Sequence, residues 1–326
     1  MKMYIQKVSI PLRHSFSITG YRFDETKTVR VSLQDGQFCG RGEGVGVYYM
    51  QETQDSMYEQ LCAVQQELEG IINPEPSVSE ILPPGGARNA LDCALWDLQA
   101  KKSGISLYDR FGLMRNPLTT VFTIGINNKA VMADAARQCA QYPTLKVKLD
   151  SVEPIERLEA IRKVRPDASI IIDANQAWTL DELKEYAPAC KKLDIAMIEQ
   201  PLARGQDEQL VEYQSPVPLG ADESCLHDGE YTYAAARYQV INIKLDKCGG
   251  LTTALKLIEM SKADGKQLMV GNMIGTSLSM APAHLIGQAC SFIDLDGPLH
   301  LAQDVMHPMH YSPQGMVSAP SQALWG

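Results

Sequence analysis

The chain has 326 residues, a net charge of −9 at pH 7 and an isoelectric point near 5.2. This acidic balance gives no electrostatic support for nucleic-acid binding, and no apolar stretch approaches the roughly 20 residues that a membrane helix needs. The eight cysteines form no Cys-x-x-Cys pair, which argues against a zinc ribbon or a dense disulfide framework. Because the N-terminus also lacks the pattern of a signal peptide, we expect a cytoplasmic protein.

Residues 1–115 read as an α+β domain that precedes the main fold. Strand-like runs at 3–10 and 28–33 are followed by helical patterns. The clearest helix, 88–101, carries an apolar stripe and stops at a Ser-Gly pair. The glycine-rich run 40–46 lacks both the spacing of a dinucleotide fingerprint and a following Gly-Lys-Ser/Thr. We therefore expect this run to be a turn or a flexible edge.

From residue 116 onward, short apolar runs alternate with helical patterns such as 154–164. The runs are rich in β-branched residues, which is typical of buried parallel strands. Eight such units predict a (β/α)8 barrel over 116–303, capped by the α+β domain, and their uniform period favours this over the alternative, an open doubly wound sheet. We expect the remaining segment, 304–326, to pack back on the cap. The predicted strands are 120–124, 145–149, 170–173, 195–199, 218–222, 240–244, 267–270 and 291–295.

Charged residues recur at the ends of the central strands, at positions 22 to 26 apart. They are Lys148, Asp173, Glu199, Asp222 and Lys244. In a barrel, the carboxyl ends of the strands converge on one mouth, where active sites lie. Because an unpaired buried charge costs several kcal/mol, we expect these groups to need each other, a metal ion, or both.

The three carboxylates of the series, Asp173, Glu199 and Asp222, predict one Mg²⁺ per subunit, because this ion prefers hard oxygen ligands. The alternative is a set of separate salt bridges to the lysines. A zinc hydrolase is disfavoured, because the chain has no His-x-His at a strand end. His284 falls in a helical stretch, and we expect it to be a packing residue.

The lysines predict proton transfer. Lys146 and Lys148 share one face of a strand, where each disfavours the other's charge and so lowers the pKa toward that of a useful base. Lys244 lies four units further round the barrel, opposite Lys148, so the two could remove a proton from one face of a carbon and return one to the other. The alternative is a lysine pair neutralised by the carboxylates. Lys247, in the following loop, is interpreted as a supporting or surface residue.

These motifs resemble those of the muconate-lactonising subgroup of the enolase superfamily. The matching motifs are Lys-x-Lys at 146–148, Asp-Ala-Asn at 173–175, Glu-Gln-Pro at 199–201, Ala-Asp-Glu-Ser at 221–224 and Asn-Ile-Lys at 242–244. Residues 42–44 and the helix 88–101 are similar to the capping domain of that superfamily. The resemblance implies Mg²⁺ on Asp173, Glu199 and Asp222, an acid–base pair of Lys148 and Lys244, and Lys146 on the substrate carboxylate. A mandelate-racemase-type member would have a His near position 272 instead.

The end of the eighth predicted strand suggests a substrate. Asp294 and Asp296 lie on one side of the strand by alternation, and two carboxylates together can receive a cation. The pair is similar to the motif by which dipeptide epimerases hold the substrate α-ammonium. The alternative is a turn at Asp296-Gly297 with Asp294 paired to a lysine. The resulting hypothesis is inversion at the α-carbon of the C-terminal residue of a dipeptide.

Substrate specificity should come from cap loops that close over the mouth, with 14–25 and 48–52 as candidates. Arg22 is a candidate ligand for an acidic substrate side chain, as in relatives that act on Ala-Glu, although it also reads as an ordinary loop residue.

Other reactions fit the same residues. N-succinylamino acid racemase, o-succinylbenzoate synthase and muconate cycloisomerase share the lysines and carboxylates but need no double-aspartate grip. Outside this class, the alternatives are a Schiff-base lysine aldolase and a non-catalytic binding protein. The expected partner is a small-molecule dipeptide, with no nucleic acid or membrane, and a homo-oligomer is left open.

Overall fold

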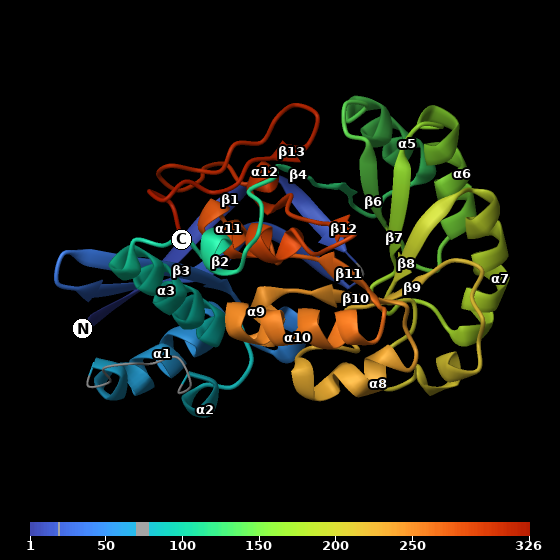
Figure 1. The fold of residues 1–326 in the computed structure, drawn as a ribbon. Helices are drawn as coiled ribbons and strands as arrows, with labels where there is room; N and C mark the ends of the chain where they lie inside the picture. The colour runs from blue at the N-terminus through green and yellow to red at the C-terminus, as the bar shows by residue number, and fades with distance from the viewer. Residues whose placement is uncertain (19, 70–77) are drawn as a thin grey trace.

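A three-stranded antiparallel sheet organises the N-terminal domain (Figure 1). The structure is a computed structural model that describes residues 1–18, 20–69 and 78–326. Strands β1 (Lys2–Ile18), β2 (Tyr21–Asp35) and β3 (Phe38–Val45) lie in that order. The pairing of β1 with β2 shifts register between Pro11 and Phe16, close to the hairpin that joins them.

Residues 40–45 of the glycine-rich run lie in β3, an edge strand of the sheet, so the prediction of a turn is wrong. A Cβ on Gly42 would lie 2.1 Å from the Ala90 carbonyl oxygen, and one on Gly44 would lie 2.0 Å from the Gly86 oxygen. The glycines therefore let the backbone of α3 (Gly86–Ser103) lie directly against the strand. The predicted helix is confirmed, and it ends at Gly104 with φ of 69°.

Shorter elements complete the N-terminal domain around α3 and the sheet. They are η1 (Tyr48–Met50), α1 (Gln54–Glu69), α2 (Val78–Ile81) and α4 (Leu107–Arg110).

Eight parallel strands form the second part of the molecule, in the sequential order β5 to β12. The ring closes between its last and first strands, because the backbone N–H of Val121 donates to the Ile293 carbonyl at 2.9 Å and that of Leu295 donates to Thr120 Oγ1 at 2.8 Å. The predicted (β/α)8 barrel is thus confirmed. Its strands are β5 (Phe122–Ile124), β6 (Thr144–Lys148), β7 (Ser169–Asp173), β8 (Ile195–Glu199), β9 (Leu219–Ala221), β10 (Val240–Ile243), β11 (Gln267–Val270) and β12 (Phe292–Ile293).

Helices and short 3₁₀ turns surround the barrel (Figure 1). They are α5 (Lys129–Gln138), α6 (Pro154–Val164), α7 (Leu180–Lys192), η2 (Glu208–Val211), η3 (Asp228–Glu230), α8 (Tyr231–Ala235), α9 (Leu245–Cys248), α10 (Leu251–Ala263), α11 (Ser277–Gly287) and α12 (Gly297–His300).

Strand alternation divides the barrel interior into an apolar layer and a charged layer. The apolar layer comprises Val121, Ile171, Met197, Val240 and Met269, all buried. Two residues further along their strands, Asp173 follows Ile171 and Glu199 follows Met197 on the same face. The packed layer therefore closes the barrel beneath the charged groups and leaves them at the mouth.

The N-terminal domain is fastened to the barrel by buried polar contacts. Arg88 of α3 donates to the carbonyl oxygens of Gly249 and Cys248, at 3.1 and 2.5 Å, and Asn89 donates to Asp246 at 2.7 Å. The C-terminal segment also returns to α3, where the indole N–H of Trp325 donates to the Cys93 carbonyl at 3.0 Å. Its strand β13 (Met316–Val317) pairs with β4 (Leu118–Thr119).

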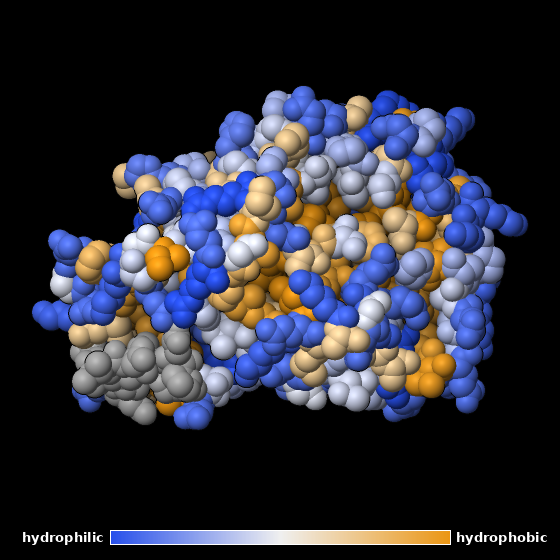
Figure 2. Space-filling view, in the orientation of Figure 1, coloured by the Kyte–Doolittle hydropathy of each residue, from blue (hydrophilic) through white to orange (hydrophobic). Residues whose placement is uncertain are grey.

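Helix α11 lies between the two parts of the molecule and is buried along its whole length. His284 in this helix contacts the Tyr108 hydroxyl at 2.7 Å and the Val317 carbonyl at 3.3 Å, so it is a satisfied packing residue as predicted. Figure 2 shows that hydrophilic side chains surround an apolar area in the centre of this face. Within the described ranges, no helix is both long and apolar enough to span a membrane.

Candidate active site

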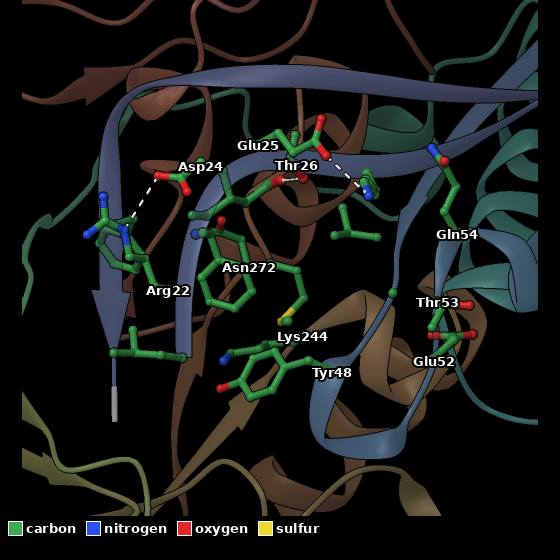
Figure 3. Close-up of a pocket in the computed structure, with 18 of the residues that line it drawn as sticks. Arg22, Asp24, Glu25, Thr26, Tyr48, Glu52, Thr53, Gln54, Lys244 and Asn272 are labelled. Carbon is green, nitrogen blue, oxygen red and sulfur yellow. Dashed lines mark hydrogen bonds and ion pairs between the residues drawn. The ribbon is translucent and has the colours of Figure 1, made fainter. Parts of the chain in front are cut away.

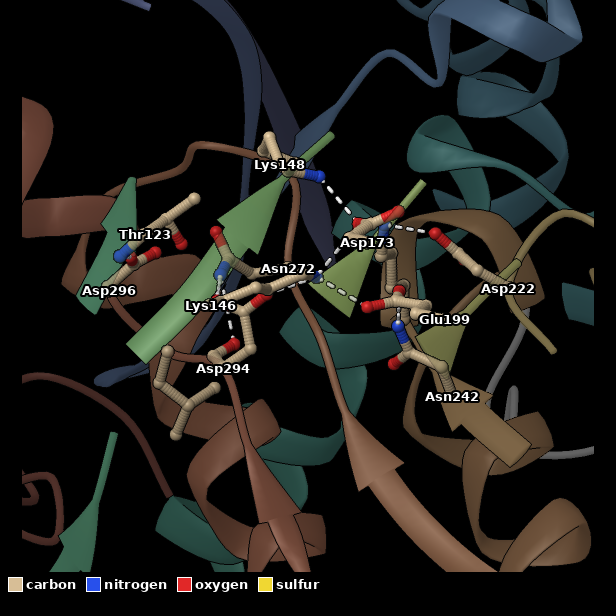
Figure 4. A network of polar contacts seen from close by, with 12 residues as sticks. Thr123, Lys146, Lys148, Asp173, Glu199, Asp222, Asn242, Asn272, Asp294 and Asp296 are labelled. Atoms are coloured by element: carbon tan, nitrogen blue, oxygen red, sulfur yellow. Dashed lines mark hydrogen bonds and ion pairs between the residues drawn. The ribbon is translucent and has the colours of Figure 1, made fainter. Parts of the chain in front are cut away.

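The charged side chains predicted from strand ends meet at the barrel mouth (Figure 4). Lys146 and Lys148 come from β6, Asp173 ends β7 and Glu199 ends β8. Asp222 and Lys244 directly follow β9 and β10. All six residues are buried, with exposed fractions between 0 and 7%.

Lys146 is surrounded by carboxylates. Its Nζ atom lies 2.8 Å from Glu199 Oε2, 2.9 Å from Asp294 Oδ2 and 3.2 Å from Asp173 Oδ2. Burial opposes the ammonium charge, but these carboxylates outweigh it and hold the pKa of Lys146 well above its usual value. The predicted lowering of this pKa by Lys148 is therefore wrong for Lys146. The alternative, neutralisation by the carboxylates, describes its surroundings.

Lys148 and Lys244 each contact one carboxylate of the predicted metal set. Lys148 Nζ lies 2.6 Å from Asp173 Oδ2 and 3.1 Å from Asn175 Oδ1. Lys244 Nζ lies 2.6 Å from Asp222 Oδ2. Strands β6 and β10 are four positions apart in a ring of eight, so the two lysines approach the mouth from opposite sides.

Lys247 is a buried support and not a surface residue. It is 0% exposed, and its Nζ atom donates to the Asp222 carbonyl at 2.7 Å and to Oδ1 at 2.8 Å. The loop predicted here is the helix α9, which begins directly after Lys244. Residues three apart in such a turn lie on one side, which brings both ammonium groups to Asp222.

Several amides of the site were missed by the sequence interpretation. Asn242 donates to Glu199 Oε1 at 2.6 Å, and Asn272 donates to Asp294 Oδ1 at 3.0 Å. Gln200 Oε1 accepts from the backbone N–H groups of Asp222 and Ser224, both at 3.0 Å. Asn242 could have been found, because alternation along β10 places it on the same face as Lys244.

The carboxylates fit a hard divalent cation. Burial, followed by the charge of Asp173, raises the pKa of Glu199 to about 7, and burial with Asp222 raises that of Glu223 to about 8. Glu223 Oε2 is buried without a hydrogen-bond donor, whereas Glu199 Oε2 forms an ion pair with Lys146 Nζ at 2.8 Å. Within the described ranges no group of three acidic, imidazole or thiol side chains is arranged around a vacant metal position, and lysine ammonium groups lie among the carboxylates of the site. The all-oxygen donor set and the unsatisfied Glu223 oxygen suit Mg²⁺.

Asp294 and Asp296 lie beside this network and differ in their partners. Asp294 contacts Lys146 and Asn272. Asp296 Oδ2 accepts from the backbone N–H of Thr123 at 2.9 Å and lies 3.3 Å from His300 Nε2. Burial opposes ionisation of Asp296, but His300 and Thr123 outweigh it and lower its pKa. Position 296 therefore carries a negative charge at neutral pH.

A cavity of about 730 Å³ opens above the mouth, between the barrel and the cap (Figure 3). Lys148 and Lys244 line it from the barrel, while Arg22 and Tyr48 line it from the cap. Both predicted lid segments, 14–25 and 48–52, contribute lining residues, and position 19 lies outside the described residues. Arg22 is 68% exposed and donates to Ser15 Oγ at 2.8 Å.

Family models match most of the chain. Residues 2–112 match the mandelate racemase/muconate lactonizing enzyme N-terminal domain, and residues 130–323 match the enolase C-terminal domain-like family. Among curated proteins, the chain is 39% identical to an N-acetyl-D-glutamate racemase of Pseudoalteromonas, over 91% of this chain and 94% of the relative. It is 38% identical to the L-Ala-D/L-Glu epimerase of Escherichia coli K12, over 93% and 95% of the two chains.

Solved structures are similar over the whole molecule. An enolase family member of Agrobacterium tumefaciens, described as having homology to dipeptide epimerases and holding sodium and L-Ala-L-Glu, is 37% identical, with 99% of both chains covered and a TM-score of 0.95. A dipeptide epimerase of Enterococcus faecalis V583, complexed with Mg and L-Leu-L-Tyr, is 27% identical, with 100% and 99% covered and a TM-score of 0.92. The chain thus belongs to the mandelate racemase/muconate lactonizing enzyme group of the enolase superfamily.

Proposed function

We propose that the protein is a Mg²⁺-dependent dipeptide epimerase that inverts the α-carbon of the C-terminal residue by two-base proton transfer. The observation that carries the proposal is the opposition of Lys148 and Lys244 across one cavity, beside three buried carboxylates and a pair of aspartates. Relatives named as epimerases, and solved dipeptide epimerases with Mg and dipeptide bound, support the same reading.

The two lysines would act on opposite faces of the α-carbon. As a neutral amine, one lysine takes the α-proton, while the other, as an ammonium, returns a proton to the opposite face. Their roles exchange with the handedness of the substrate. Both side chains line the cavity, and the packed layer beneath them keeps bulk water from entering through the barrel.

Asp173, Glu199 and Asp222 would hold the metal ion, with the amide of Asn242 orienting Glu199. When bound, Mg²⁺ supplies positive charge for the substrate carboxylate as the α-proton leaves. Lys146, deep in the same network, would add its own charge at that carboxylate. Asp294 and Asp296 would receive the α-ammonium of the N-terminal residue.

A second candidate is racemisation of an N-acylated amino acid on the same residues. It is favoured by the Pseudoalteromonas relative, whose name specifies N-acetyl-D-glutamate. The lysines and the carboxylates would work identically, and the two candidates differ only in the group that faces Asp294 and Asp296. Muconate cycloisomerase and o-succinylbenzoate synthase chemistry would leave the pair without an ammonium to bind.

Exchange of the substrate α-proton with deuterated solvent tests the proposal directly. Wild-type protein with Mg²⁺ should exchange and interconvert L-Ala-L-Glu and L-Ala-D-Glu, as followed by NMR. Lys148→Ala should reduce α-proton exchange more strongly for one epimer than for the other. Lys244→Ala should show the opposite preference. Lys27→Ala is the matched control, because Lys27 lines the cavity but pairs with Glu25 at 3.1 Å. Equal loss for both epimers in each variant would reject the two-base assignment.

The cytoplasmic location stays a prediction from the sequence, and the oligomeric state stays open.

A further inference from the structure

His300 contacts both Asp296 and Phe16, a residue of the cavity lining. Its Nε2 atom lies 3.3 Å from Asp296 Oδ2, and its ring packs against Phe16 at a centroid distance of 5.2 Å. Phe16 comes from β1 of the cap and lines the cavity. Phe122 of β5 lies on the ring as well, at 6.0 Å. The imidazole therefore packs against one side chain from the cap, Phe16, and one from the barrel, Phe122.

The two aspartates are not equivalent in charge. Asp294 is paired with Lys146, whose Nζ lies 2.9 Å from its Oδ2 and is shared with Asp173 and Glu199. Asp296 has a neutral backbone donor, Thr123, and within the described ranges His300 is the sole cationic side chain that lies within 4.0 Å of it. The protonation of His300 thus determines whether the negative charge of Asp296 is compensated within the protein or available to a substrate.

The charges around His300 come from few elements. Asp296 faces it from the turn before α12, and Asp294 faces it from the end of β12. On β1, Arg13 donates to the carbonyl oxygen of the next residue, Leu301, at 2.8 Å, and β5 contributes Phe122 with no charge. Burial disfavours the imidazolium, but Asp296 outweighs burial and raises the pKa of His300 above its ordinary value. The imidazolium therefore persists to a higher pH than that of an ordinary histidine.

We propose that His300 determines whether the site takes a substrate with a free ammonium or one with a neutral, acylated nitrogen. With a neutral imidazole, the charge of Asp296 is available to the ammonium of a dipeptide. With an imidazolium, Asp296 is already neutralised, an ammonium is repelled, and an N-acyl group is accepted. The inference rests on the proposed function. It would let one set of residues accept both kinds of substrate that the names of two relatives, 39% and 38% identical, specify.

The test compares two substrates that share the glutamate, L-Ala-L-Glu and N-acetyl-L-glutamate, by α-proton exchange between pH 6 and 8.5. The readout is the ratio of kcat/KM for the dipeptide to that for the N-acetyl substrate. Titration of the metal site and of the lysines affects both substrates and cancels in this ratio. Comparison of each variant with wild type at the same pH also cancels titration of the dipeptide amine.

Two variants fix the charge at position 300. His300→Gln keeps a neutral donor of similar reach, and it should raise the ratio about tenfold over wild type at pH 6, with convergence at pH 8.5. His300→Lys keeps a positive charge, and it should hold the ratio low throughout. Both effects should appear in KM for the dipeptide rather than in kcat. His310→Gln, at an exposed histidine of the same region, should follow wild type.

A measurement on wild type alone guards against variants that fail to fold. By linkage, binding of L-Ala-L-Glu near pH 7 should release a proton from the imidazolium, whereas binding of N-acetyl-L-glutamate should release none. Calorimetry in buffers of different ionisation enthalpy measures this difference. Equal proton release for both ligands, or the same pH profile in wild type and His300→Gln, would overturn the role of His300. Absence of exchange with both substrates in wild type would instead overturn the proposed function.

Discussion

Lys247 binds both the backbone and the side chain of Asp222, with its Nζ atom 2.7 Å from the backbone carbonyl oxygen and 2.8 Å from Oδ1. Lys244 contacts the other carboxylate oxygen, Oδ2, at 2.6 Å. Burial raises the free energy of the Asp222 carboxylate, but the two lysines outweigh it and lower the pKa of the group. Lys247 would therefore continue to fix the carboxylate if Lys244 turned toward a substrate.

Replacement of Lys247 by Met should destabilise the metal-free protein by about 3 kcal/mol, because one partner of a fully buried ion pair is removed. Mg²⁺ should restore part of this loss, since the cation compensates the same carboxylate. Urea unfolding with and without Mg²⁺ measures both effects. Lys256→Met is the control: its ammonium is exposed and 4.0 Å from Asp228, so the change should stay within about 0.5 kcal/mol. Equal stability of the two variants would contradict the assigned role.

Metal binding should be visible as stabilisation independent of activity. A ligand at 100 times its Kd adds about 2.7 kcal/mol to the free energy of unfolding, so Mg²⁺ should raise the Tm of wild type and EDTA should reverse the change. Glu199→Gln removes one expected ligand charge and should abolish most of the shift. Asp134→Asn changes an exposed carboxylate on α5 and should leave the shift intact. A Tm shift that survives in Glu199→Gln would place the metal elsewhere.

The fold could be predicted because its signals are local and repeated. Each barrel strand is a short apolar run, and the central strands end at or directly before a charged residue. Strand alternation then sets which residues share the interior, as for Ile171 and Asp173. The glycine run of β3 cannot be predicted in this way, because the reason for its glycines is not local. Gly42 faces the carbonyl of Ala90, and nothing in the sequence near position 42 shows that α3 packs there.

The site divides in the same way. Strand ends identified its charged residues, but pairings across the barrel decide the charge state of each one. Repulsion between Lys146 and Lys148 was inferred from their spacing, whereas the three carboxylates around Lys146 come from β7, β8 and the end of β12. The burial of Lys247 against Asp222 could not be predicted, because the sequence does not show that a helical turn starts directly after Lys244.

Arg22 is expected to select an acidic side chain at the C-terminal residue of the substrate. Arg22→Met should lower kcat/KM for L-Ala-L-Glu about tenfold, through loss of one charge-assisted hydrogen bond at an accessible position, and should leave L-Ala-L-Leu nearly unchanged. The reference variant is Lys27→Met, which removes another cation from the cavity lining. A loss shared by both dipeptides, or one reproduced by Lys27→Met, would show that Arg22 serves the lid and not the substrate.

His284 should make stability fall in mild acid. Burial lowers its pKa to about 4 from an ordinary 6.5. Between these two pH values, the histidine is therefore protonated in the unfolded chain and neutral in the folded protein. Because the folded pKa is the lower one, the penalty appears as the pH falls below 6.5 and reaches its full size, about 3 kcal/mol, below about 4. Between pH 7 and pH 5 it amounts to about 2 kcal/mol.

Urea unfolding at pH 7 and pH 5 isolates this contribution when wild type is compared with His284→Gln, which keeps an amide near the Tyr108 hydroxyl but does not titrate. The variant should lose stability at pH 7, because the fitted imidazole is gone, yet its further loss on going to pH 5 should be about 2 kcal/mol smaller than that of wild type. His310→Gln, at an exposed histidine, should show the wild-type difference. If His284→Gln and wild type lose the same stability between the two pH values, His284 is protonated in the folded protein. Its Nδ1 atom then cannot accept a hydrogen bond from the Tyr108 hydroxyl.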